Sequence, residues 1–195
     1  MHRLLPAFIE TAAAAVFLVP IFLYLNKVKF HNLKTTAAAF LFSLYLSIVY
    51  AMAGLPNVTY VRFQPNFNFI PFQYFFTDHT SLLNVLLFVP LGVFLPILRT
   101  KFKKFLPTVL FGLLMSMFIE VFQIFTFRAT DINDLITNTV GTILGYFLGK
   151  RLLRYFPQLI LTEETNELKS ICISVLFVMF FLQPFLSGLI WNVIY

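Results

Sequence analysis

The sequence predicts an all-α fold: a polytopic bundle of about six transmembrane helices, or five if the last apolar run does not span. Of the 195 residues, 59% are hydrophobic and only 11% are charged, whereas a soluble domain is about 25% charged. Several apolar runs are long enough to cross the roughly 30 Å of hydrocarbon in a bilayer. The runs are continuous rather than alternating, which favours helices over a barrel of strands. We expect a single transmembrane domain over residues 1–195.

The predicted spans follow one another with short connections. In chain order they are residues 7–25, 35–55, 81–98, 105–127, 133–149 and 170–191. The fifth is shorter and polar at its start, and we still count it as a span. Glu10 interrupts the first run, whose longest apolar stretch follows the alanines, so we expect this run to be retained rather than cleaved as a signal peptide.

The basic residues predict the orientation of the chain. Connections 26–34, 99–104 and 150–169 carry 11 of the 14 Lys and Arg residues, and the other side keeps only Arg3, Arg62 and Arg128. The positive-inside rule therefore places these connections in the cytoplasm and both termini outside. A lipid-headgroup or partner site is the alternative interpretation of the 99–104 cluster. Because the formal charge of +6 is explained by topology, we expect no nucleic-acid partner.

Polar residues that membrane helices normally avoid gather near the predicted outer surface. A charge within the bilayer costs up to about 3 kcal/mol, so each should face protein, water or a ligand. The spans place all of them in the outer third of the membrane. They are Asn84 on the third span, Glu120 and Gln123 on the fourth, Arg128 in the next connection, and Asp131, Asp134 and Asn138 at the fifth. We interpret this cluster as a ligand site that opens to the outer face.

Purely structural roles are open for several of these residues. Asp131 could cap the fifth helix, with Asp134 completing an arrangement like a capping box. Glu120 and Arg128 could form a buried ion pair that only fixes helix packing. Asn84 alone would more often link helices than contact a ligand.

A ladder of small residues continues down the fifth span. Gly141, Gly145 and Gly149 recur every four residues and share one helix face. Such a small-xxx-small pattern lets the backbone of another helix approach closely. The three glycines therefore predict a helix-packing face.

Three stretches of the chain resemble the VanZ-like family of bacterial membrane proteins. They are NVLLFVPLG at residues 84–92, EVFQ at 120–123 and RATDINDLITNTVGTILG at 128–145. The resemblance covers about residues 35–150. It implies a multi-pass protein of the bacterial cell membrane, from a family whose founding member is associated with resistance to the glycopeptide teicoplanin. The residues that match the motifs are Asn84, Pro90, Gly92, Glu120, Gln123, Arg128, Asp131, Asp134, Asn138 and Gly141.

The long outer connection, residues 56–80, is rich in aromatic residues and contains three prolines. It suits the headgroup region, as an anchor or as a lid over the polar site with Arg62 and His79 available to an anion. We expect no metal and no cofactor, because no second His or Cys accompanies His79. The lone Cys172 forms no intramolecular disulfide.

Taken together, these features predict an envelope protein that binds a polar lipid at the outer leaflet. The expected partners are membrane lipids, with a lipid-linked cell-wall precursor bearing phosphate or sugar, or a lipoglycopeptide, as the candidate ligand. The expected effect is on susceptibility to lipoglycopeptides such as teicoplanin. A membrane-embedded enzyme acting on such a lipid, and a transporter or flippase for it, are the alternatives. The sequence does not choose among these three, and it leaves the oligomeric state open.

Overall fold

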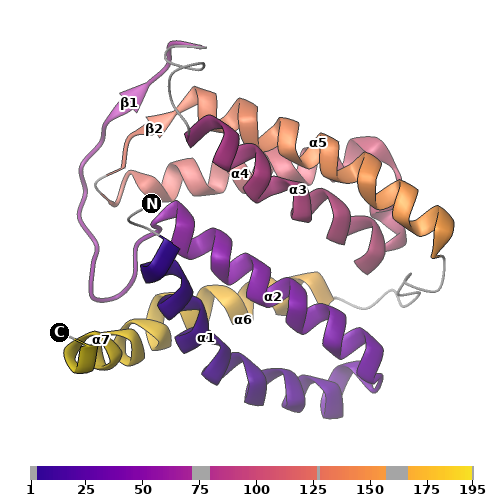
Figure 1. Cartoon of the computed structure of the whole chain (residues 1–195), viewed down its shortest axis with the longest axis horizontal. Coiled ribbons are helices and arrows are strands. Elements are labelled where there is room, and N and C mark those ends of the chain that lie inside the picture. The colour runs from indigo at the N-terminus through magenta and orange to yellow at the C-terminus, as the bar shows by residue number, and fades with distance from the viewer. Residues whose placement is uncertain (1–3, 72–79, 127, 157–166, 195) are drawn as a thin grey trace. The chain divides into compact units, whose positions relative to one another are not determined.

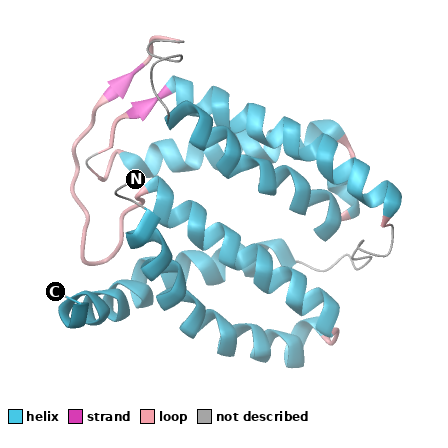
Figure 2. Cartoon of the chain, viewed as in Figure 1, coloured by secondary structure: helices cyan, strands magenta, loops and turns pink. Residues whose placement is uncertain are grey.

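The computed structural model describes residues 4–71, 80–126, 128–156 and 167–194. Arg3, His79, Phe127 and residues 157–166 of the predicted cytoplasmic connection lie outside the described residues. Within the described ranges the chain is helical apart from turns, loops and two short strands (Figure 2). The all-α fold class is therefore confirmed.

Five helical segments are long and apolar enough to cross a membrane, judged by length and composition over the described residues. They are Leu4–Phe30, Leu33–Ala53, Thr80–Leu98, Phe105–Gln123 and Leu168–Val193. The last apolar run, which the sequence left open, is one of the five. Helix α5 (Ile132–Tyr155) forms where another span was expected. It is not among the five candidate spans, because the polar residues of its first half lower its mean hydropathy. That α5 crosses the membrane stays a prediction.

The helices gather into two compact units, one of residues 1–62 and 165–195 and the other of residues 63–164. In the first unit, α1 (Leu4–Leu25) packs on α2 (Leu33–Ala53), and α2 packs on α6 (Glu167–Phe177). The π-helical segment η1 (Asn26–Phe30) extends α1. A second one, η4 (Val178–Leu182), joins α6 to α7 (Gln183–Ile194), which packs on α1.

The ends of α2 show how the sequence sets helix boundaries in the first unit. The Asn32 side chain caps its start by accepting a hydrogen bond from the Lys34 backbone N–H at 2.9 Å. Gly54 ends it in the left-handed conformation (φ 60°), which glycine adopts without a steric penalty.

The second unit is built on three helices (Figure 1). Helix α3 (Thr80–Leu98) leads through the short 3-10 helix η2 (Thr100–Lys103) into α4 (Phe105–Gln123), and α5 follows. Helix α5 packs on both α3 and α4, and its contact with α3 is the more extensive. Two short strands, β1 (Phe67–Asn68) and β2 (Thr130–Asp131), lie side by side in parallel at one end of the unit.

Backbone-to-backbone approach explains the extensive contact between α3 and α5. A Cβ built on Gly145 would overlap the Val89 carbonyl oxygen and would lie 3.0 Å from the Gly92 Cα. One built on Gly149 would lie 3.0 Å from the Val93 Cα. Side chains at these positions would therefore push the two helices apart.

Helix α4 ends earlier than the sequence predicted, at Gln123 rather than at residue 127. The turn after it closes through hydrogen bonds between residues three apart instead of four. The backbone N–H and the hydroxyl of Thr126 both donate to the Gln123 carbonyl oxygen, each at 3.0 Å. The Ile124 carbonyl accepts instead from the backbone N–H of Gln64 at 3.0 Å. Because the carbonyls that would continue the helix are taken in this way, the α-helical pattern stops.

Helix α5 runs past its predicted end at residue 149 as far as Tyr155. The added turns carry Lys150, Arg151 and Arg154. Positive side chains are favourable at a helix C-terminus, and their long stems can lie along apolar surface.

Candidate functional site

Among the described residues of the second unit, Glu120 is the buried carboxylate. It lies in the last turn of α4 and is 6% exposed. Its Oε2 accepts a hydrogen bond from the backbone N–H of Asp131 at 2.8 Å, and the Thr130 hydroxyl donates to its backbone carbonyl at 3.0 Å. Arg128, Asp131 and Asp134 lie within electrostatic range of this carboxylate. Glu120 thus ties the end of α4 to the chain that enters α5.

Asp131 organises the start of α5 through both of its carboxylate oxygens. Oδ1 accepts from the backbone N–H of Asn133 at 2.8 Å and from the Asn133 side-chain amide at 2.9 Å. Oδ2 accepts from the side-chain amide of Asn68 at 3.0 Å. The predicted helix cap is therefore confirmed, and the same side chain also holds β1.

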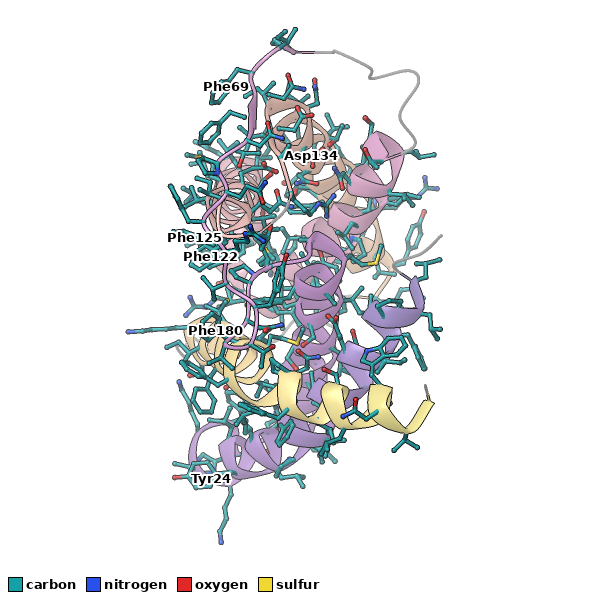
Figure 3. The ribbon with its side chains drawn as sticks, turned by 90° about the vertical axis from the view of Figure 1, so that its left-hand side faces the viewer. Tyr24, Phe69, Phe122, Phe125, Asp134 and Phe180 are labelled. Atoms are coloured by element: carbon teal, nitrogen blue, oxygen red, sulfur yellow. The ribbon has the colours of Figure 1, made fainter. Side chains whose placement is uncertain are left out.

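Residues 66–70 of the aromatic connection lie against the residues around Asp131. The backbone N–H of Thr130 donates to the Asn66 carbonyl at 2.8 Å, next to the strand pairing. The Asn133 side-chain amide donates to the Ile70 carbonyl at 3.3 Å. Figure 3 shows Phe69 and Asp134 at the same end of the unit. The segment is thus fixed beside the polar residues, while Phe69 itself is 67% exposed.

Asn138 lies one helical turn after Asp134 and links α5 to α4. Its side-chain amide donates to the Ser116 hydroxyl at 2.9 Å, and Asn138 is 4% exposed. Further along, Gly112 of α4 faces Thr142, since a Cβ on this glycine would lie 2.6 Å from the Thr142 Cγ2. Asn138 and Thr142 thus pack against α4 within the unit.

Among the described residues, the buried side-chain atoms without a hydrogen-bond partner include Nδ2 of Asn84, Oε1 of Glu120 and Oδ1 of Asn138. Each comes from a different helix of the second unit. An unsatisfied buried polar atom costs about 1–3 kcal/mol, so these positions favour a partner such as water or a ligand group.

The predicted site residues occupy one unit and, apart from Asn84 and Asn138, surround the junction of α4 and α5. Gln123 is buried in the last turn of α4, Arg128 is half-buried in the connection, and Asp134 lies in the first turn of α5. Among the described residues no three His, Cys, Asp or Glu side chains are close enough to hold a metal ion.

Sequence reasoning missed Asn68 and Asn133, which complete the hydrogen bonds around Asp131. The alternation of asparagine and phenylalanine at residues 66–69 was a signal for a strand at Asn68. Asn133 carried no such signal for its bond to the Ile70 carbonyl, because that bond joins it to a segment far away in the sequence.

The helices and this buried polar junction define a polytopic membrane protein with a polar site in a three-helix unit. A sequence model of the VanZ/LLP1 family matches residues 39–154, which is more than half of the chain. The chain therefore belongs to the VanZ/LLP1 family.

One curated relative adds detail to this assignment. Protein VanZ of Enterococcus faecium is 41% identical over 85 residues, which cover 42% of this chain and 51% of that protein. The chain thus matches about half the length of this relative. No solved structure matches the chain.

Proposed function

We propose that this protein binds the polar part of a lipid or lipid-linked cell-wall precursor at the outer leaflet and thereby alters susceptibility to teicoplanin. The observation that carries the proposal is the buried Glu120, whose Oε2 is held by the Asp131 backbone while its Oε1 has no hydrogen-bond partner among the described residues. A carboxylate fixed by one oxygen presents the other in a defined direction.

The chemistry of the unsatisfied atoms indicates what part of a ligand they would contact. Oε1 of Glu120 and Oδ1 of Asn138 are acceptors, and Nδ2 of Asn84 is a donor. Sugar hydroxyls and peptide amides offer both kinds of partner, and wall precursors carry both groups. In this proposal Arg128 meets the anionic group of the ligand, and Gln123, Asp131 and Asp134 shape the polar surroundings.

The outer location of the site follows from the proposed orientation. The cluster lies at the end of α4 that is remote from the basic connection at residues 99–104. The positive-inside rule places that connection in the cytoplasm, so the cluster and both termini face outside. The resemblance to the VanZ-like family supports the link to teicoplanin.

Paired substitutions of carboxylates test the proposal. Glu120→Gln keeps an oxygen for the Asp131 N–H but replaces the acceptor at Oε1 by a donor. Glu10→Gln, which removes a carboxylate from α1 of the other unit, is the control. We expect bacteria that express the wild type or Glu10→Gln at matched levels to be protected against teicoplanin, and those with Glu120→Gln to be sensitive. Equal protection by both variants would contradict the proposal.

A further inference from the structure

The end of the second unit that is remote from Glu120 carries a pocket of about 250 Å³. Three of its lining residues are cations and three are apolar or aromatic. The cations are Lys103, Lys150 and Arg154, and the other three residues are Pro96, Tyr146 and Leu153. No carboxylate is among these lining residues; the described acidic residues of the unit are Glu120, Asp131 and Asp134, at its other end.

Tyr146 builds the wall of this pocket. It is 3% exposed, and its hydroxyl donates to the Lys103 carbonyl oxygen at 2.9 Å, which fixes η2 against α5. The ring of Phe105 packs edge-on against it at 5.4 Å. The Lys150 Nζ lies 5.9 Å from the centre of the tyrosine ring, within reach of a cation–π interaction. The backbones that carry two of the cations are therefore held in place by one buried side chain.

The pocket adjoins the ends of two candidate membrane spans. One candidate span ends at Leu98 and the next begins at Phe105, and η2 lies between them. The polar headgroups of a bilayer lie directly beyond the hydrocarbon region. The apolar residues of the lining suit the part of a lipid that joins its phosphate to its acyl chains.

We propose that this pocket binds a phosphate group, as presented by an anionic phospholipid. Arg154 supplies a planar fork for two phosphate oxygens, and Lys103 and Lys150 supply point charges. The alternative is that these cations serve only to orient the chain in the membrane. Orientation depends on how many basic residues lie near a span, and it does not require that they line one pocket. Basic pockets between transmembrane helices are known sites for anionic headgroups.

Two triple variants with the same net charge distinguish binding of the lipid in this pocket from diffuse electrostatic attraction to the basic surface. The first changes Lys103, Lys150 and Arg154 to Gln. The control changes Lys101, Lys104 and Arg151, which are exposed neighbours outside the lining. Binding is measured on the purified full chain by native mass spectrometry, with phosphatidylglycerol, phosphatidylcholine and inorganic phosphate as separate probes.

We expect the wild type and the control triple to retain phosphatidylglycerol in preference to phosphatidylcholine. The pocket triple should bind phosphatidylglycerol at least about tenfold more weakly, since each lost hydrogen bond to a charged group weakens binding by roughly that factor. Competition by inorganic phosphate at comparable concentration would support the same pocket with a soluble phosphate as its ligand.

Equal losses in the two triples would overturn the proposal in favour of diffuse attraction, as would a wild type that shows no preference for the anionic lipid. The single variants Lys103→Gln and Arg154→Gln, each expected to bind about tenfold more weakly, provide the same comparison if the pocket triple does not fold.

Discussion

Replacing Gly145 by alanine tests whether the contact between α3 and α5 holds the second unit together. The new Cβ would overlap the Val89 carbonyl oxygen and lie 2.9 Å from the Val89 carbonyl carbon. Ordinary van der Waals contact begins at 3.4 Å, so the carbon contact alone requires the two backbones to separate by about half an ångström, and the closer overlap with the oxygen requires more. Backbone atoms of two packed helices cannot move aside as a side chain can.

The expected cost follows from this overlap. Overpacking of a tight interface costs about 1–3 kcal/mol, and membrane helices have no hydrophobic force between them to offset lost contact. Gly149→Ala should cost less, because its nearest contact is 3.0 Å from Val93. Gly188 of α7 has nothing within 4 Å, so Gly188→Ala should be neutral or stabilise its helix by up to about 1 kcal/mol.

The free energy of unfolding is measured by titrating each variant in mixed micelles with a denaturing detergent and following helicity. Leu144→Ala, at a position 48% exposed on the same helix, controls for a change of side chain that faces away from α3. A Gly145→Ala variant as stable as Gly188→Ala would refute the close packing of α3 and α5.

Three further predictions concern the polar junction and the orientation. Asp131→Ala should lower the free energy of unfolding by about 0.5–2 kcal/mol, because the helix cap is lost. Asp131→Asn can still cap and should cost less in the same titration. Equal losses for the two variants would mean that the cap contributes nothing to stability. Glu120→Ala leaves the Asp131 N–H without its acceptor and should cost about 1–3 kcal/mol of stability. Glu120→Gln keeps an acceptor and should be nearly as stable as the wild type. A large loss for Glu120→Gln would mean that the charge of Glu120 stabilises the fold. In a Cys172→Ser background, an impermeant thiol reagent added outside should label Ala129→Cys but not Thr100→Cys, both of which are exposed positions, and the reverse pattern would invert the orientation.

Composition and continuous apolar runs predicted the membrane helices because both follow directly from the cost of placing polar groups in hydrocarbon. The same reasoning missed the end of α4, because that end depends on hydrogen bonds made by Thr126 and by the distant Gln64. It also could not pair Gly145 with Gly92, which belongs to another helix, although each glycine was noted on its own.

The candidate site divides in a similar way. Glu120 and Gln123 on α4, and Asp131, Asp134 and Asn138 at α5, recur at spacings of three or four residues, which indicates one polar face on each helix. The capping role of Asp131 follows from local sequence. The contacts of Asn68 with Asp131 and of Asn133 with the Ile70 carbonyl join segments about 63 residues apart, and helical periodicity contains no information on such pairs.

The central claim is that the junction around Glu120 binds the polar part of a lipid. Native mass spectrometry of the protein purified from bacterial membranes, with any released lipid then identified by fragmentation, tests this claim most directly. The account predicts that the wild type and Glu10→Gln carry a lipid that bears sugar hydroxyls or peptide amides, and that Glu120→Gln, although folded, has lost it. A lipid of this kind retained equally by Glu120→Gln, or its absence from every form of the protein, would contradict the account.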